Sequence, residues 1–274
     1  MGSIHVEEGM TIAFLTEEHY EMMAAELHEA YRTKRGLAPL TERYPDMSEH
    51  DAYRIQLHYV KLRVESGRRI VGKKIGLTSK AMQAMLHVDQ PDYGHLFDDM
   101  LLPEGKALAR DELLQPRVEP EIAFYLKEDL SGPGLNAAKV LAATQFVLPA
   151  LEIIDSRIAD WRIKLPDTVA DNASSAKVVL GGRPLPVDAC DLRLMGMLLE
   201  KNGQPVQFSC GAAVMGHPAE AIAWLGNKLY EYGVSLEAGE IILPGACCAA
   251  IEIERGDHIR ATFDRLGSVG LTVV

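Results

Sequence analysis

Two periodicities of apolar positions divide this chain near residue 68. Before that point, apolar residues recur every three or four positions, as they do on one face of a helix. A first helix is expected over residues 16–31 and a second between Ser48 and Gly67, with residues 37–47 as the link. Ser48 is also a suitable N-cap residue, because Asp51 three positions later completes a capping box.

Beyond residue 68, short apolar runs separated by turn residues predict strands. The expected strands are residues 69–77, 118–126, 148–154, 178–180, 240–243, 249–254, 258–263 and 269–273. Helices are expected over residues 80–86, 136–144 and 217–232. The pattern therefore predicts an α+β fold in which a helical N-terminal segment, residues 1–68, packs on a mostly antiparallel β domain, residues 69–274.

The charge balance narrows the possible partners of this fold. The chain has 28 Lys and Arg against 39 Asp and Glu, a net charge of −11 at pH 7. An acidic chain without a basic stripe is a poor partner for nucleic acid or an anionic membrane. An anionic substrate would need local positive charge, which a bound metal ion can supply.

Cysteine usage and hydropathy bear on location. The four cysteines, Cys190, Cys210, Cys247 and Cys248, form no CxxC pair. No apolar run approaches the ~18 residues of a membrane span. We therefore expect buried thiols in a reducing compartment and a soluble cytoplasmic protein.

Three acidic residues are the first candidates for chemistry. Glu119 and Glu121 are two positions apart on an expected strand, so their side chains share one face. Glu152 lies among apolar residues of another expected strand. Carboxylates that are close together and poorly solvated need a shared proton or a cation, and three of them suit Mg²⁺ or Mn²⁺. By spacing alone, Glu119 and Glu121 also fit the wet face of a half-exposed strand.

Lys74 is a second candidate. Gly67, Gly72 and Lys73 come close to a phosphate-binding loop, but Lys74 occupies the Ser/Thr position and the expected context is wrong, so this motif is rejected. A lysine in an apolar strand between glycines can act as an acid, a base or an electrostatic group. A solvated lysine on an edge strand fits the same pattern.

Polar loops give weaker indications. The loop at residues 171–175 carries amide and hydroxyl groups that could hold a carboxylate, or that simply make a turn. His217 is interpreted as a helix cap, because Pro218 follows it. The common hydrolase, zinc-protease and dinucleotide motifs are absent from the sequence.

Six segments taken together resemble the 2-keto-4-pentenoate hydratase / 4-oxalocrotonate decarboxylase family, within the fumarylacetoacetase-like superfamily. They follow in family order, and the resemblance runs from about Ser48 to the C-terminus. The segments are KIGLTS (74–79), VDQPDYG (88–94), PRVEPE (116–121), LEIIDSR (151–157), VADNAS (169–174) and LGSV (266–269).

The resemblance implies a fumarylacetoacetase-like β-roll with Mg²⁺ or Mn²⁺ held by Glu119, Glu121 and Glu152. It implies catalytic roles for Lys74 and Asp92 at the reacting carbon skeleton. It also implies that the substrate is bound by residues of two turns, namely Thr78 and Ser79 in one and Asn172 and Ser174 in the other.

The activity implied is that of a hydratase, a carbon–oxygen lyase that adds water to a 2-hydroxy-2,4-dienoate and gives a 4-hydroxy-2-oxo acid in meta-cleavage degradation of aromatic compounds. The alternative is a 4-oxalocrotonate-type decarboxylase, which shares the enolate chemistry. An acylpyruvate-type hydrolase and a non-catalytic partner subunit fit less well. A homo-oligomer, with a possible complex with a pathway neighbour enzyme, is also implied.

The choice between the two reactions depends on the far end of the substrate. A decarboxylase substrate carries a second carboxylate, which needs a cation. Lys73 and Arg117 neighbour inward-facing positions and are expected to point away, whereas Arg157 has no assigned place. We therefore expect a largely apolar tail pocket.

Pro120 stands where relatives usually have Ala, which suits an edge strand or a bulge. Cys247 and Cys248 stand where relatives often have Leu-Thr, which puts tail specificity in doubt.

Overall fold

The computed structural model describes residues 15–79, 83, 88 and 90–274. The expected helix at residues 80–86 lies largely outside this part of the chain. Within the described residues, no helix has the length and apolarity needed to cross a membrane.

Helices form the N-terminal part, as expected. They are α1 (Glu17–Thr33), the short α2 (Leu40–Arg43) and α3 (Glu49–Glu65). The predicted capping box at the start of α3 is present, because the Ser48 side chain accepts from the Asp51 N–H while Asp51 accepts from Ser48 N–H. Asp51 also accepts a 2.5 Å hydrogen bond from the hydroxyl of Tyr20 on α1. The two long helices are thereby joined where α3 begins.

The larger sheet has nine strands, with the path β2-β1-β10-β4-β5-β6-β3 and with β11 on β4 and β7 on β5. Among the strands that the structure describes, only the β1–β10 and β3–β6 pairs are parallel. These strands are β1 (Ile70–Gly76), β2 (Asp92–Phe97), β3 (Leu101–Pro103), β4 (Arg117–Leu126), β5 (Thr144–Ile154), β6 (Ser175–Leu180), β7 (Leu185–Pro186), β10 (Ile241–Leu243) and β11 (Ile251–Glu252).

A smaller antiparallel sheet has the order β13-β12-β8-β9. Its strands are β8 (Gly196–Lys201), β9 (Gln204–Cys210), β12 (His258–Phe263) and β13 (Gly267–Thr272). The α+β class and the mostly antiparallel pairing expected from the sequence are confirmed. The sequence had not predicted β2, β3, β7, β8 or β9.

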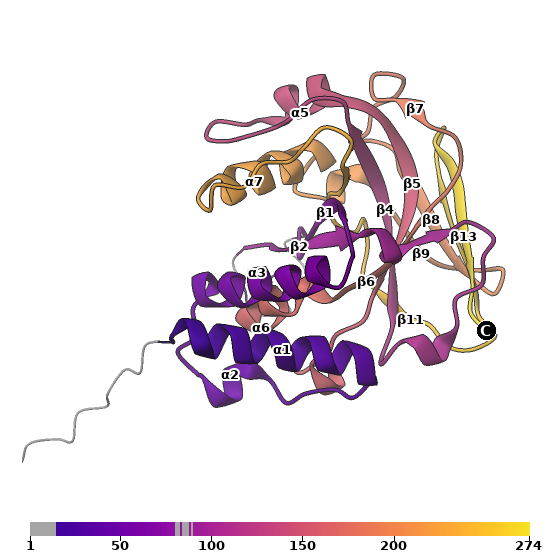
Figure 1. Ribbon diagram of the computed structural model, residues 1–274. Coiled ribbons are helices and arrows are strands. Elements are labelled where there is room, and N and C mark those ends of the chain that lie inside the picture. Colours follow the sequence, from indigo (N-terminus) through magenta and orange to yellow (C-terminus); the bar gives the residue numbers. More distant parts are fainter. Residues whose placement is uncertain (1–14, 80–82, 84–87, 89) are drawn as a thin grey trace, which may run out of the picture.

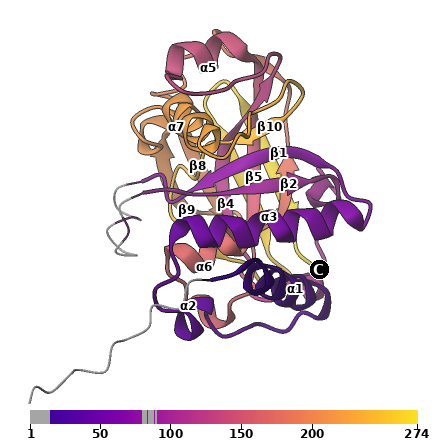
Figure 2. The same cartoon turned by 60° about the vertical axis from the view of Figure 1, so that its left-hand side comes forward.

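The remaining helices cover the larger sheet at two places (Figures 1 and 2). The helix α6 (Leu165–Ala170) lies with α1–α3 on one side, whereas α5 (Ala137–Ala143) and α7 (Pro218–Tyr230) pack together at the other. His217 caps α7 by accepting from the Ala219 N–H, as expected. Short 3-10 turns, η1 (Asp98–Met100), η2 (Arg110–Glu112), η3 (Ala159–Trp161), η4 (Asn172–Ser174) and η5 (Gly211–Ala213), make the connections.

Candidate metal centre and active site

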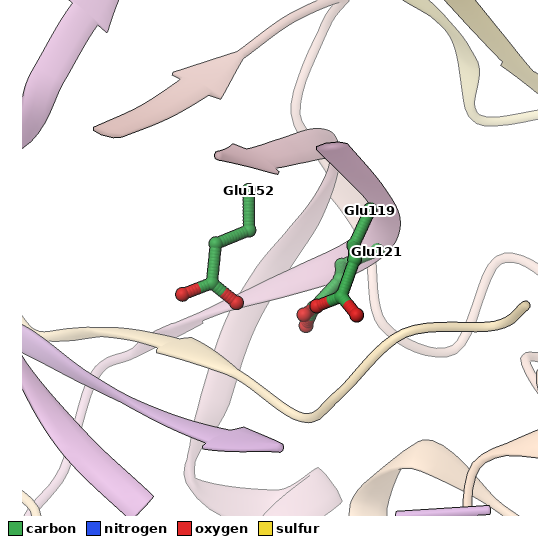
Figure 3. A group of neighbouring side chains, drawn as sticks. All are labelled: Glu119, Glu121 and Glu152. Carbon is green, nitrogen blue, oxygen red and sulfur yellow. The ribbon is translucent and has the colours of Figure 1, made fainter. Parts of the chain in front are cut away.

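Three carboxylates meet on one face of the β4–β5 pair. Glu119 lies directly opposite Glu152, and Glu121 follows two residues along β4 on the same face. Each residue offers one oxygen, and these three oxygens lie within 4.8 Å of one another (Figure 3). The strand register thus produces the convergence that the spacing of Glu119 and Glu121 had indicated in part.

These carboxylates are poorly satisfied for such buried groups. Glu121 and Glu152 are 0% exposed. Glu121 Oε2 accepts from the Gly245 N–H at 2.8 Å, and Glu152 Oε2 has the Lys74 Nζ at 3.4 Å as an ion-pair partner. Glu121 Oε1 and Glu152 Oε1 have no hydrogen-bond donor within the described part of the chain. Unpaired buried oxygens of this kind are expensive unless a cation or protons compensate them.

The pKa values of Glu119 and Glu121 are raised, as expected for buried carboxylates that lie close together. Burial, and then repulsion from Glu152 and Glu119, raises the pKa of Glu121 well above its usual range. Burial also raises the pKa of Glu119 to about 8, although Lys74 opposes the rise. Three carboxylate oxygens with positions left open fit a hard divalent cation such as Mg²⁺ or Mn²⁺.

Lys74 lies beside this cluster. On β1 its side chain is buried, and Nζ lies 3.4 Å from Glu152 Oε2 while donating to the carbonyl of Ala173 at 3.0 Å. Burial opposes the charged amine, but Glu152 and Asp92 outweigh it, so the pKa of Lys74 is raised. The side chain therefore holds a positive charge in the site.

Lys73 points to the other face of β1, as expected, and donates to both oxygens of Glu240 at 2.5 and 2.7 Å. The alternation of a strand therefore separates two adjacent lysines into two different environments. The solvated edge-strand interpretation does not apply to Lys74, because its strand lies between β2 and β10.

Asp92 begins β2 opposite Gly76, at the end of β1. Its Oδ2 accepts from the Thr168 hydroxyl at 2.6 Å, whereas Oδ1 has no partner among the described residues. A Cβ at position 76 would overlap Asp92 Oδ1 and lie 3.2 Å from Lys74 Nζ. The absence of a side chain at Gly76 is therefore what lets the two candidate catalytic groups approach each other.

A cavity of about 100 Å³ opens beside these groups. Its polar lining includes Lys74, Asp92, Glu119 and Ser174. The rest of the lining is largely apolar and consists of Leu77, Ile154, Trp161, Ile163, Ala173 and Ala250, together with Gly76, Thr168 and Arg117. A smaller hollow of about 20 Å³ is lined by Leu77, Thr78, Ser79, Glu119, Ala246 and Cys248.

The predicted substrate-binding residues separate into two groups. Ser174 lines the cavity, and Thr78 and Ser79 border Glu119 in the smaller hollow. Asn172 does not line either space, because its side-chain amide is bonded to the N–H and the carbonyl of His95 at 2.7 and 2.9 Å. In the structure Asn172 holds the turn against β2.

The expectation for Arg117 was wrong. Arg117 is two residues before Glu119 and therefore shares its face of β4, so it lines the cavity instead of pointing away. Arg157 is fully buried and bound by Asp171 and by backbone carbonyls. Trp161 and Thr168 also line or support the site, and no spacing in the sequence had indicated them.

Pro120, for which an edge strand or a bulge was expected, lies where β4 is paired on one side only. β5 pairs with it there, whereas β11 and β10 pair with residues 117–118 and 124–125 of β4. The Pro120 carbonyl accepts from the Cys247 N–H, and a strand residue directs its N and its carbonyl to the same side. That side faces the loop that joins β10 to β11, both of which pair with β4. The missing N–H of Pro120 therefore costs no hydrogen bond to β5.

All four cysteines are free thiols.

Comparison with known proteins gives a consistent result. Residues 65–274 match the family described as fumarylacetoacetate (FAA) hydrolase C-terminal. A 2-hydroxyhexa-2,4-dienoate hydratase of Comamonas testosteroni is 47% identical over 257 residues, covering 93% of this chain and 97% of that protein. A 2-hydroxypent-2,4-dienoate hydratase of Pseudomonas putida is 50% identical over 211 residues, covering 77% and 95%.

A solved structure of the 4-oxalocrotonate decarboxylase from Pseudomonas putida G7, complexed with magnesium and adipate, superposes with a TM-score of 0.93 at 37% identity. The alignment covers 95% of this chain and 99% of that one. Similarity to both reaction types therefore extends over nearly the whole molecule, and the fumarylacetoacetase-like fold expected from the sequence is confirmed.

Proposed function

The chain belongs to the fumarylacetoacetate hydrolase family, and from that premise we propose that it is a metal-dependent hydratase of 2-hydroxy-2,4-dienoates. The relatives with 47% and 50% identity are dienoate hydratases, whereas a 4-oxalocrotonate decarboxylase of Pseudomonas sp. (strain CF600) is 40% identical over 255 residues. The single observation that carries the proposal is the cluster of three carboxylates beside Lys74 and Asp92, of which Glu121 and Glu152 are fully buried with oxygens that lack hydrogen-bond donors among the described residues.

We propose that Glu119, Glu121 and Glu152 bind Mg²⁺ or Mn²⁺. When bound, such an ion supplies Lewis acidity and a template for a chelating 2-oxo acid. Magnesium is present in the related decarboxylase structure, which supports this choice. The three side chains supply negative charge that a divalent cation offsets, so the site tolerates an anionic substrate that the carboxylates alone would repel.

Two residues are proposed to act on the carbon skeleton. Conversion of the dienol to a 2-oxo-3-enoate removes the proton of the 2-hydroxyl group and adds one at C5, after which water adds across C3 and C4. The charged Lys74 stabilises negative charge that develops on the 2-oxygen. Asp92 lines the cavity and its Oδ1 has no partner among the described residues, so this carboxylate is suited to accept and return a proton.

Ser174, Thr78 and Ser79 are proposed to hold the substrate carboxylate, because hydroxyl donors surround the cluster on two sides. The boundary at residue 68, the homo-oligomer and the cytoplasmic location stay predictions from the sequence.

A decarboxylase is the second candidate, and the observation in its favour is Arg117 in the cavity lining. The purified chain with Mg²⁺ should be supplied separately with 2-hydroxypenta-2,4-dienoate and 2-oxo-3-hexenedioate. We expect faster loss of the dienoate ultraviolet absorbance, with 4-hydroxy-2-oxopentanoate as the product. Faster CO₂ release from the hexenedioate would reverse the assignment.

A further inference from the structure

The face of β4–β5 that holds the carboxylates continues outward to a cation. Opposed pairs along it are Glu121 with Ala150, Glu119 with Glu152, and Arg117 with Ile154. Two residues of a strand advance the chain by roughly 7 Å, so Arg117 begins that far beyond Glu119. Among the described residues that line the cavity, Arg117 and Lys74 are the only cations. The lining of the cavity therefore includes the Glu119 carboxylate and, two residues away on the same face of β4, the cationic Arg117.

The Arg117 guanidinium has a defined position. Its Cζ lies 4.6 Å from the centroid of the Trp161 ring, and Nη2 lies 3.2 Å from Glu252 Oε1. The Trp161 indole is itself fixed, because its Nε1–H donates to the carbonyl of Gln115 at 3.0 Å. An arginine stacked on a fixed ring presents its N–H groups at the edge of the guanidinium plane, in the geometry that a carboxylate accepts.

The existing partner of Arg117 is a weak competitor. The Glu252 side chain is 74% exposed, whereas that of Arg117 is 33% exposed. Exposed ion pairs contribute little net stability because water screens them. Within the described ranges, Glu252 is the only hydrogen-bond partner of the Arg117 side chain. An anion that enters from the cavity can therefore use the remaining N–H groups or displace Glu252.

The chemistry of the cavity separates two kinds of substrate tail. A neutral tail needs only the apolar wall of Ile154, Ile163 and Ala250. A tail that ends in a second carboxylate would be costly to desolvate there without a cation. We propose that Arg117, held by Trp161, determines tail specificity by pairing with a distal carboxylate, and that Glu252 opposes this pairing. This inference rests on the proposed function and extends it to dienoates that carry a second, terminal carboxylate.

The test compares hydration of 2-hydroxypenta-2,4-dienoate with that of 2-hydroxyhepta-2,4-diene-1,7-dioate, in the full chain with Mg²⁺. The quantity measured is the ratio of kcat/KM for the dioate to kcat/KM for the pentadienoate. Arg117→Gln should lower this ratio on the order of 10- to 100-fold, as expected for loss of a charged hydrogen bond. Glu252→Gln should raise it several-fold, because the competing carboxylate is gone.

The opposite signs distinguish recognition from a structural role. If the Arg117–Glu252 pair only maintained the fold, both variants would change the ratio in the same direction or leave it unchanged, and the inference would be wrong. Arg162→Gln is the matched control, since Arg162 follows Trp161 but pairs with Glu42 outside the cavity; it should leave the ratio unchanged. A parent chain that hydrates neither compound would overturn the proposed function, whereas hydration with an unmoved ratio would overturn only this inference.

Discussion

Lys74 and Lys73 show that a shift of one position along a strand changes the whole environment of a side chain. They are adjacent on β1, yet one faces Glu152 and the cavity while the other pairs with Glu240 on the opposite face. The period of two along a strand predicts that they separate. It does not predict which lysine faces the carboxylates, because that depends on strands distant in the sequence.

Replacing Lys74 by Met should lower kcat by a factor on the order of 10² to 10⁴, with a smaller change in KM. The reason is that a cation beside the reacting group acts mainly on charge that develops in the transition state. Steady-state kinetics with 2-hydroxypenta-2,4-dienoate and saturating Mg²⁺ measure this.

Lys73→Met is the matched control for that variant. It leaves Glu240 buried without its cation, so it should cost about 3 kcal/mol of unfolding free energy. The kcat of the folded protein should change much less than in Lys74→Met. Equal kcat losses in the two variants, or an unchanged kcat in Lys74→Met, would remove the role assigned to Lys74.

The residue scale also shows where sequence reasoning stopped short. The alternation that places Glu119 and Glu121 together also applies to Arg117, and its consistent use would have put Arg117 in the cavity. Asn172 could not have been placed in this way. Its amide is taken up by the backbone of His95, a partner 77 positions away in the sequence.

At the scale of elements, the loop that follows β10 completes the carboxylate cluster. Gly245 has φ of 109°, a conformation that favours glycine, and its N–H donates to Glu121 Oε2. A Cβ at this position would overlap the Thr78 side chain. One glycine therefore lets this loop contact both the candidate metal ligands and the turn after β1.

Gly245→Ala should weaken Mg²⁺ activation about 10-fold, because the loop must move away from Thr78 and the bond to Glu121 is lost. The measurement is the Mg²⁺ concentration that gives half-maximal hydration. Gly256→Ala is the matched control, since Gly256 has φ of 93° but open space around its Cβ position. That variant should cost about 1 kcal/mol of stability through backbone strain and leave the Mg²⁺ dependence unchanged. Indistinguishable Mg²⁺ dependence in the two variants would argue against this role of the loop.

Helices and strands were predicted well where the local sequence pattern determines them, and poorly where pairing with a distant strand determines them. The capping box at Ser48 and the cap at His217 are local signals, and both were confirmed. The strands β8 and β9, on either side of Asn202 and Gly203, were not predicted, and their pairing contains a register shift between Leu199 and Glu200. The strand β2 contains Asp, Gly and His, and it is a strand because it pairs with β1.

At the scale of the whole molecule, His95 ties separate parts of the fold together. Its Nδ1 lies 3.0 Å from Gln56 Oε1 on α3, and the Gln56 amide donates to carbonyls of Tyr93 and Val169. Burial, with a smaller effect of Lys73, lowers the pKa of His95 to about 3. The folded protein therefore holds this imidazole neutral.

This shift makes stability depend on pH. Between about pH 3 and pH 6.5 the unfolded chain binds a proton at His95 that the folded protein does not, so stability falls as the pH falls through this window. Relative to pH 7.5, the loss at pH 5 from this group is about 2 kcal/mol. The test is denaturant unfolding of the parent and of His95→Gln at pH 7.5 and pH 5. The difference in unfolding free energy between the two pH values should be smaller in His95→Gln than in the parent by that amount. Equal differences between the two pH values in parent and variant would contradict this assignment.

The overall class followed from the order of the segments, because helical periodicity comes first and strand patterns follow. The positions at which β4, β5, β1 and β2 meet in one site did not follow from that order. They depend on long-range register, such as Glu119 opposite Glu152 and Gly76 opposite Asp92. The family resemblance supplied these contacts indirectly.

The most direct test of the central claim is the Mg²⁺ dependence of dienoate hydration by protein freed of metal with a chelator. We expect no loss of 2-hydroxypenta-2,4-dienoate absorbance without metal and saturable recovery when Mg²⁺ or Mn²⁺ is added. Glu121→Gln should remain folded but need at least 10-fold more metal, because one of three anionic ligands is gone. Full hydration by the metal-free protein, or a Glu121→Gln variant with the metal dependence of the parent, would contradict the account.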